Sequence, residues 1–152
     1  MGGKGSASGS KPRLCLRLVE EEMKSVCLEH GCIKCCLRTK MPLSNADISR
    51  ITGLGFSEDS FVVKKDGERR LRNSKGRCVF HNGQVCTIYD VRPEGCRIYP
   101  VLFDMDTRGI VLDRNCAHNE RFSITPRTSR DITRLVQRLR MEKDSRLKSR
   151  QR

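Results

Sequence analysis

Cysteine spacing constrains this chain more than any other feature of its sequence. Eight of the nine cysteines form two groups, Cys27, Cys32, Cys35 and Cys36 in the first and Cys78, Cys86, Cys96 and Cys116 in the second. A separation of two residues, as between Cys32 and Cys35, lets two sulfurs converge on one metal ion from a tight turn. The eight thiols are therefore candidate metal ligands, enough for two tetrathiolate sites or for one cluster with spare thiols. The ninth, Cys15, lies outside the pattern and is expected to be a buried or free thiol.

Little apolar material is available to hold such a chain together. Only 36% of the 152 residues are apolar, 5% are aromatic and there is no Trp, so a large hydrophobic core is not expected. The first 13 residues lack the apolar stretch of a secretory signal, and no segment has the apolar length of a membrane-spanning helix. We therefore expect a cytoplasmic chain whose reduced thiols bind metal and thereby stabilise the fold.

Composition divides the chain into three segments. Residues 1–13 are rich in Gly, Ser and Lys, carry a charge of +3, and are expected to form a flexible basic arm. Residues 14–126 hold the cysteines, have a charge of only +3, and are expected to form the metal-binding domain. Residues 127–152 contain 10 basic and 3 acidic residues and are expected to form a basic amphipathic helix and tail. The expected fold is a small α+β, metal-stabilised cysteine-rich domain with short strands and hairpins and a basic C-terminal helix.

Local patterns predict three helices. Residues 14–26 have an apolar edge typical of a short helix, and Ser44 followed by Asp47 is the pattern of a capping box that starts a second helix. Thr128 with Asp131 predicts the start of the C-terminal helix, whose pattern fades beyond Met141. Its apolar face consists of Ile132, Leu135, Val136 and Leu139.

Short strands are predicted between these helices. Residues 60–65 and 69–72 flank a turn, and residues 78–81 and 84–89 flank Asn82-Gly83, a dipeptide typical of β-hairpins. Two more short strands are expected at residues 98–103 and 110–112.

Two motifs resemble the YkgJ-like cysteine-cluster family. The first is CIKCC at residues 32–36 with MPL at 41–43 and DI at 47–48. The second is CVF at 78–80 with CTIYDVRPEGCRIYP at 86–100. The resemblance spans about residues 27–120 and departs from the family pattern at Cys27, which is separated from Cys32 by four intervening residues rather than two. Members are described as zinc- or iron-chelating domains and as iron–sulfur proteins, and a related domain occurs in flagellin lysine methylases. The resemblance implies zinc or a [4Fe–4S] cluster as cofactor.

Residue types alone leave the ligand arrangement open. Zinc accepts four thiolates in a closed site, and a [4Fe–4S] cluster also takes four. Neighbouring side chains diverge in an extended chain, so Cys35 and Cys36 serve different sites or only one is a ligand. Some of the cysteines could instead be small buried apolar residues. Arg92 and Arg97 flank Cys96 and are candidates for donating hydrogen bonds to thiolates or for pairing with Asp90. An ordinary surface salt bridge is the alternative. The histidines, His30, His81 and His118, lie close to cysteines in the sequence, and any of them could replace a thiolate in a Cys3His site. Because eight thiols already suffice, we expect them at the surface.

Two functions fit these features. The first is a metal-stabilised binding module whose basic ends contact RNA or a ribonucleoprotein, with no membrane partner. Its phosphate-contacting residues would be Arg130, Arg134, Arg138 and Arg140 on the C-terminal helix. The second is an iron–sulfur redox or transfer protein that acts in the modification of a macromolecule, a hypothesis that rests on the family. The sequence contains no recognised catalytic motif, which leaves open whether the protein is an enzyme.

Overall fold

The structure, a computed structural model, describes residues 26–152. Its elements are η1 (Lys34–Cys36), α2 (Asn45–Thr52), α3 (Glu58–Phe61), β1 (Val62–Lys65), β2 (Glu68–Leu71), β3 (Asn73–Ser74), β4 (Arg77–Cys78), η2 (Tyr89–Val91), α4 (Glu94–Ile98), β5 (Val101–Asp104), β6 (Gly109–Leu112), η3 (Asn119–Arg121) and α5 (Pro126–Arg150). The strands form three two-stranded antiparallel sheets, β1–β2, β3–β4 and β5–β6. The expected small α+β fold with short strands and a long C-terminal helix is thus confirmed.

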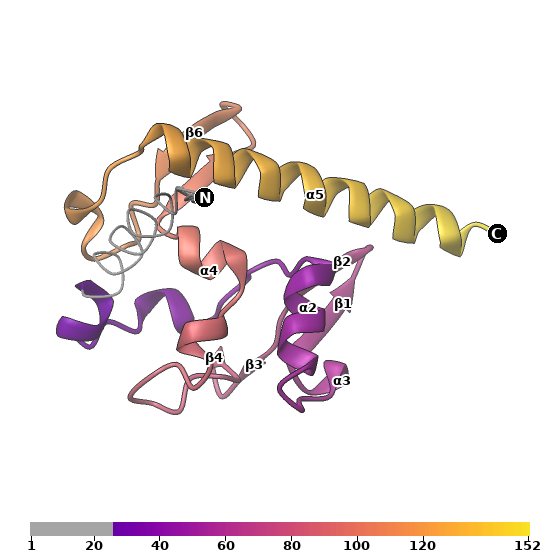
Figure 1. Ribbon diagram of the computed structural model, residues 1–152, viewed down its shortest axis with the longest axis horizontal. Helices are drawn as coiled ribbons and strands as arrows, with labels where there is room; N and C mark the ends of the chain where they lie inside the picture. Colours follow the sequence, from indigo (N-terminus) through magenta and orange to yellow (C-terminus); the bar gives the residue numbers. More distant parts are fainter. Residues whose placement is uncertain (1–25) are drawn as a thin grey trace, which may run out of the picture.

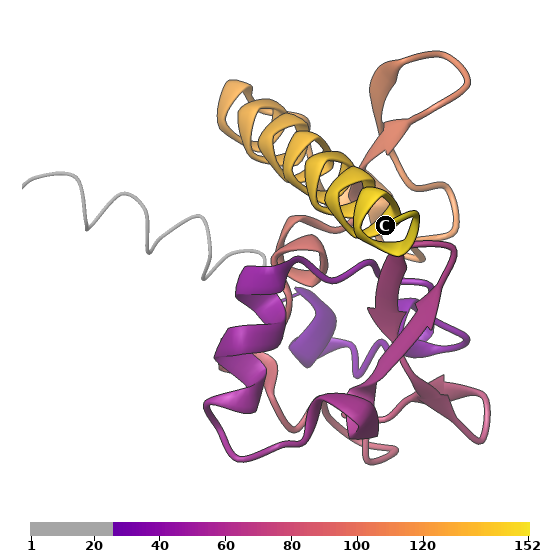
Figure 2. The same ribbon diagram turned by 90° about the vertical axis from the view of Figure 1, so that its right-hand side faces the viewer.

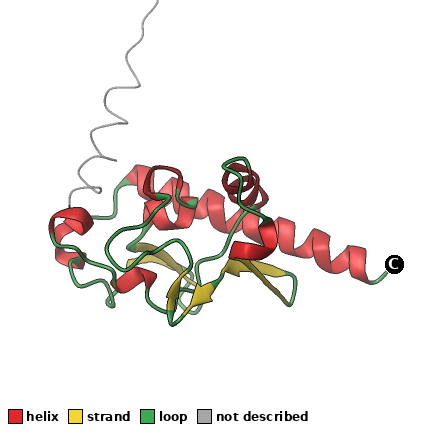
Figure 3. Ribbon diagram, turned by 90° about the horizontal axis from the view of Figure 1, so that it is seen from below, coloured by secondary structure: helices red, strands yellow, loops and turns green. Residues whose placement is uncertain are grey.

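Long α5 lies across one side of the molecule, over α4 and the β1–β2 hairpin, in both views of the molecule (Figure 1 and Figure 2). Loops join most of the other elements (Figure 3). No helix within residues 26–152 is both long enough and apolar enough to cross a membrane. The arm predicted for residues 1–13, the thiol of Cys15 and nearly all of the helix predicted over residues 14–26 lie outside the described residues.

Two small hydrophobic clusters hold these elements together. The first contains buried residues of α2, α3, β1 and β2, together with neighbouring loop residues: Leu43, Ile48, Ile51, Phe61, Val62, Leu71, Cys78, Phe80 and Ile88. The second joins α5 to α4 and β5 through Ile98, Val101, Ile132 and Leu135. Division into two small clusters is consistent with the low apolar content of the chain.

The β1–β2 hairpin is confirmed close to its predicted bounds, with Val62 opposite Leu71 and Lys65 opposite Glu68. Gly67 in its turn has a φ of +76°, a conformation that favours glycine. In contrast, the strand predicted from residue 98 begins at Val101, because Ile98 is the last residue of α4.

A regular hairpin over residues 78–89 is a wrong prediction. Cys78 is instead the last residue of β4, which pairs with the preceding strand, β3. Of the strand pairing expected between residues 78–81 and 84–89, only the isolated β-bridge between His81 and Cys86 is present. The Asn82 side chain explains the difference, because its Oδ1 accepts hydrogen bonds from the N–H groups of Gln84 and Val85, both at 2.9 Å. These contacts form a local turn in place of a strand ladder.

The capping box at the start of α2 is confirmed, and it has a second role. The buried Asp47 carboxylate accepts from the N–H and Oγ of Ser44, as a capping residue does. It also accepts from Nη2 of Arg50 at 2.7 Å and from the N–H of Glu94, the first residue of α4, at 3.0 Å. Arg50 in turn donates to the carbonyl oxygen of Arg92 at 3.2 Å. One carboxylate therefore connects α2 to the segment that precedes and begins α4.

The start and extent predicted for α5 require correction. The N-cap is Thr125 rather than Thr128, and Thr128 takes the N3 position of the capping box. Pro126 favours this register because its fixed φ suits the first helical position. The helix also continues past Met141 to Arg150, where Lys143 pairs with Glu68 at 2.9 Å and Nε of Arg146 donates to the carbonyl oxygen of Gly67 at 2.7 Å. Tertiary contacts thus stabilise turns that have no apolar pattern.

Replacing Asp47 by Ala removes four hydrogen bonds around a buried carboxylate. We expect a loss of about 3 kcal/mol in the free energy of unfolding, since buried donors lose their partner. Asp131→Ala is the control, because that half-exposed carboxylate lies 3.7 Å from Arg127 on the same helix and should contribute less than about 0.5 kcal/mol. Urea unfolding followed by circular dichroism measures both. Equal losses in the two variants would contradict the connecting role of Asp47.

Gly67 and Gly76 separate backbone strain from contact with α5. Both have φ near +80°, but a Cβ atom on Gly67 would meet Cγ of Leu147 at 2.9 Å, whereas one on Gly76 would meet nothing within 4 Å. Alanine at either position should cost about 1–2 kcal/mol of backbone strain. Only Gly67→Ala should also speed amide hydrogen exchange in α5 beyond Met141. Unchanged exchange there would show that the hairpin turn does not hold the end of the helix.

Candidate metal centre

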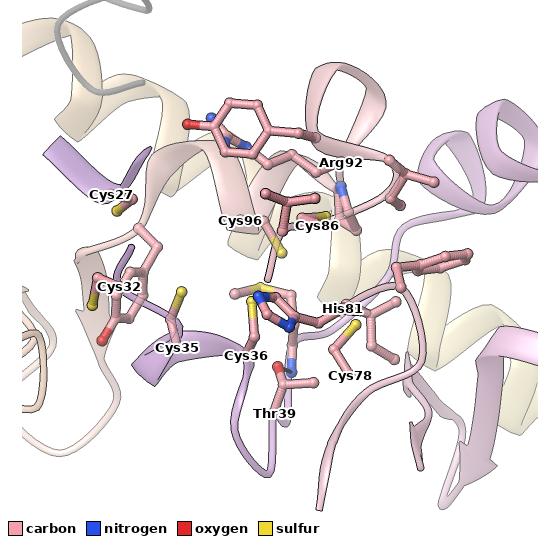
Figure 4. Close-up of a pocket in the computed structure, with 18 of the residues that line it drawn as sticks. Cys27, Cys32, Cys35, Cys36, Thr39, Cys78, His81, Cys86, Arg92 and Cys96 are labelled. Carbon is pink, nitrogen blue, oxygen red and sulfur yellow. Dashed lines mark hydrogen bonds between the residues drawn. The ribbon is translucent and has the colours of Figure 1, made fainter. Parts of the chain in front are cut away.

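Seven of the eight predicted ligands line one pocket of about 120 Å³. They are Cys27, Cys32, Cys35, Cys36, Cys78, Cys86 and Cys96, and Figure 4 shows how most of the pocket residues lie. The eighth, Cys116, is buried nearby and does not line the pocket. All eight thiols are free, none being in a disulfide. The fold thus gathers cysteines that are up to 69 residues apart in the sequence.

One set of thiols lies where the segment after residue 26 meets the loop before η3. The N–H of Cys32 donates to the carbonyl oxygen of Cys27 at 3.0 Å, so the four intervening residues form a turn that keeps both cysteines on the pocket. The His30 ring stacks on that of His118 with their centroids 4.5 Å apart. This stack brings the loop of Cys116 against the same turn.

A second set packs on the first hydrophobic cluster. Cys78 belongs to that cluster, and Cys36, Cys86 and Cys96 pack against it. They come from four places in the fold, namely the end of η1, the end of β4, the bridge to His81, and α4. Their sulfurs lie close to one another in Figure 4, on the side of the pocket away from Cys27 and Cys32.

Cys35 and Cys36 are adjacent in η1, a 3-10 turn, rather than in the extended chain considered above. The Cys36 thiol donates a hydrogen bond to the sulfur of Cys35, which lowers the pKa of Cys35 to about 7 and raises that of Cys36. Cys35 is exposed and Cys36 half-buried. This pair is the point at which the two sets of thiols meet.

Burial, and after it the crowding of thiols, opposes ionisation of Cys27 and Cys96. Burial, followed by the charges of Cys35, Cys32 and Cys116, raises the pKa of Cys27 to about 11. Burial also raises the pKa of Cys96, and Cys35, Cys78 and Cys86 add to that rise. Gathered thiolates repel one another, and a bound cation reverses this effect because it favours the deprotonated ligand.

Two arginines beside the thiols have buried nitrogen atoms, Nε of Arg92 and Nε of Arg97, that find no hydrogen-bond partner within residues 26–152. Both side chains line the pocket, and the Arg92 guanidinium lies 3.8 Å from the centroid of the Tyr89 ring. Burial raises the pKa of Cys27 and of Cys86, and the charge of Arg92 opposes that rise at both. Arg92 is therefore near both sets of thiols.

This donor set fits an anionic metal–thiolate group. Soft thiolates bind zinc and iron, and unpaired guanidinium N–H groups are donors that such an anion accepts. Within residues 26–152, no group of three or more His, Cys, Asp or Glu side chains lies close enough together to hold a metal ion. Ligation would therefore require the thiols to rotate inward from their present positions.

The histidine expectation is wrong for His81, which is buried and lines the pocket. Its Nδ1 accepts the N–H of Gly83 at 3.1 Å, so the neutral ring carries its proton on Nε2 and is a donor there. Tyr99 also lines the pocket, which agrees with its interpretation from the sequence as a core or cluster-shielding residue, and its hydroxyl donates to Asp113 at 2.9 Å.

The four arginines predicted to contact nucleic acid do not form one free surface. Arg138 pairs with Glu94 of α4 at 2.6 Å. Arg130, Arg134 and Arg140 are exposed, and none of them pairs with an acidic residue of 26–152. Among the described residues, three of the four arginines therefore have no acidic partner and can contact another molecule.

Comparison with known proteins agrees with this site. One family model, described as "Putative zinc- or iron-chelating domain" and named for its CxxCxxCC motif, matches residues 26–117. No curated protein and no solved structure matches the chain. The matched segment runs from Val26, just before Cys27, to Ala117, just after Cys116, and so contains all eight pocket-region cysteines while ending before α5. Because the match covers more than half of its length, this chain belongs to the zinc- or iron-chelating CxxCxxCC family.

Proposed function

We propose that this protein is a metal-binding module whose thiols hold zinc or iron and whose α5 contacts RNA or a ribonucleoprotein. The observation that carries the first part is the pocket itself, where seven thiols lie beside two buried guanidinium nitrogens that have no hydrogen-bond partner among the described residues. Bound metal would cross-link segments that the two small hydrophobic clusters hold only in part.

The RNA part of the proposal rests on how α5 is anchored. Ile132 and Leu135 are buried against α4 and β5, which leaves Arg130 and Arg134 on the exposed side of a fixed helix. They are four residues apart and therefore neighbours on one face. Phosphates are bound by such cationic rows, with an affinity that falls as salt rises.

A second candidate function is redox or transfer chemistry in the modification of a macromolecule. It is favoured by the apolar surroundings of the second set of thiols, where Leu43, Phe80 and Ile88 are buried in the same cluster. Apolar shielding and hydrogen bonds to sulfur tune the reduction potential of iron–sulfur clusters. In either case the residues of this chain would bind the metal, shield it and stabilise the negative charge of the metal–thiolate group.

Metal analysis of the anaerobically purified full chain distinguishes these functions. Zinc in a colourless protein would support a structural role and overturn the redox candidate. Iron with acid-labile sulfide in a brown protein would support the redox candidate. Protein that retains neither metal, even after reconstitution under reducing conditions, would refute the proposed function.

Arg92→Gln removes the charge near both sets of thiols. We expect metal affinity to fall about 10- to 100-fold, as for other losses of a group that supports metal ligands. The exposed Arg121 provides a control, and Arg121→Gln should leave affinity unchanged. Competition against a chromophoric chelator measures both, and an Arg92→Gln protein that holds metal as tightly as the Arg121→Gln protein would contradict the assigned role.

Arg130→Gln with Arg134→Gln tests the RNA contact. The double variant should bind a fluorescein-labelled single-stranded RNA more weakly, and the salt slope of log K should fall by about 1.4, since two phosphate contacts are lost. Arg108→Gln with Arg121→Gln removes the same charge elsewhere and is the control. Anisotropy titrations that show equal weakening in both double variants would attribute binding to net charge and not to α5.

A further inference from the structure

We propose that the eight thiols form two separate tetrathiolate metal sites whose boundary falls between the adjacent residues Cys35 and Cys36. Site one would consist of Cys27, Cys32, Cys35 and Cys116, and site two of Cys36, Cys78, Cys86 and Cys96. This inference rests on the proposed metal binding and adds to it the number of sites and the ligands of each. The division differs from the order of the sequence, in which Cys36 belongs with the first group and Cys116 with the second.

Packing defines the ligands of site two. Cys36, Cys78, Cys86 and Cys96 are the cysteines of residues 26–152 that contact the first hydrophobic cluster. The bridge from His81 to Cys86 and the hydrogen bond from the Thr87 N–H to the carbonyl oxygen of Phe80, 2.7 Å long, return the chain to Cys78. These contacts bring the cysteines at both ends of the loop to one wall of the pocket.

Local backbone and ring contacts define site one. The turn closed between Cys32 and Cys27 presents both thiols together, and Figure 4 shows them apart from the second set. Cys116 is tied to this turn through the stacked rings of His30 and His118.

The geometry of η1 assigns Cys35 to site one. Successive residues of a 3-10 helix are rotated by about 120°, so neighbouring side chains leave the helix in different directions. Cys36 packs on the first cluster, whereas Cys35 does not and is exposed. In Figure 4 the Cys35 sulfur lies between those of Cys32 and Cys36. Assigning it to site one completes four ligands in each site.

Arg92 is the cation placed between the sites. Its side chain lines the pocket together with Cys27 of site one and with Cys86 and Cys96 of site two. Two tetrathiolate sites with divalent metal would each carry a charge of about −2. A guanidinium held by the Tyr89 ring would reduce their mutual repulsion.

Matched serine variants of the full chain test the division. Reconstituted with zinc under anaerobic reducing conditions, the wild-type chain should hold two equivalents, measured by elemental analysis after desalting. Cys35→Ser and Cys36→Ser should each hold one. The double variant Cys32→Ser/Cys35→Ser should still hold one, whereas Cys35→Ser/Cys36→Ser should hold none. Cys15→Ser is the control and should hold two.

The outcomes separate failure of the division from failure of the proposed function. A wild-type chain without bound metal would refute metal binding. If the wild-type chain held one equivalent of zinc, and Cys35→Ser and Cys36→Ser each held none, the proposal of two sites would be refuted. Retention of one equivalent by Cys35→Ser/Cys36→Ser would refute the boundary.

Cobalt provides a second measurement on the unmodified chain, in case a variant fails to fold. Titration should give thiolate-to-cobalt absorption that rises to two equivalents with the visible bands of tetrahedral Co²⁺. Saturation at one equivalent would overturn the proposal.

Discussion

The Asp47 carboxylate is the interaction on which the arrangement of the site depends. It caps α2, binds Arg50 and accepts the first N–H of α4, so that a single buried group sets the position of the chain that carries Arg92 and Cys96. Arg50 also donates a hydrogen bond to the carbonyl oxygen of Arg92. A buried carboxylate is stable only when such partners satisfy it. The four hydrogen bonds to it therefore make the positions of α2 and α4 interdependent.

Gathering thiols imposes an electrostatic cost that the rest of the fold must offset. Each buried thiol is harder to ionise, and each neighbouring thiolate adds to that difficulty, as the pKa of Cys27 shows. The charge of Arg92 beside the pocket and the metal that this family chelates act in the opposite direction. The two small hydrophobic clusters supply only part of the cohesion. In this protein, cofactor chemistry and folding stability are therefore expected to be coupled.

Elements specified by contacts within a few residues could be predicted from the sequence. The Ser44–Asp47 capping box and the β1–β2 hairpin are of this kind. The prediction was wrong where two local signals competed: Asn82 formed a side-chain turn in place of a hairpin ladder, and Thr125 before Pro126 displaced Thr128 as the cap. The far end of α5 was missed because distant contacts with Glu68 and Gly67 stabilise it.

The sequence by itself determined the chemistry of the site: eight thiols, flanked by arginines, in a chain too poor in apolar residues to build a large core. Residue type and short-range spacing are sufficient for that conclusion. Only the tertiary structure decided which thiols are neighbours, that His81 is buried beside them, and that Arg138 is paired with Glu94. These relations join residues far apart in the sequence, and the packing of η1, β4, α4 and α5 against one another creates them.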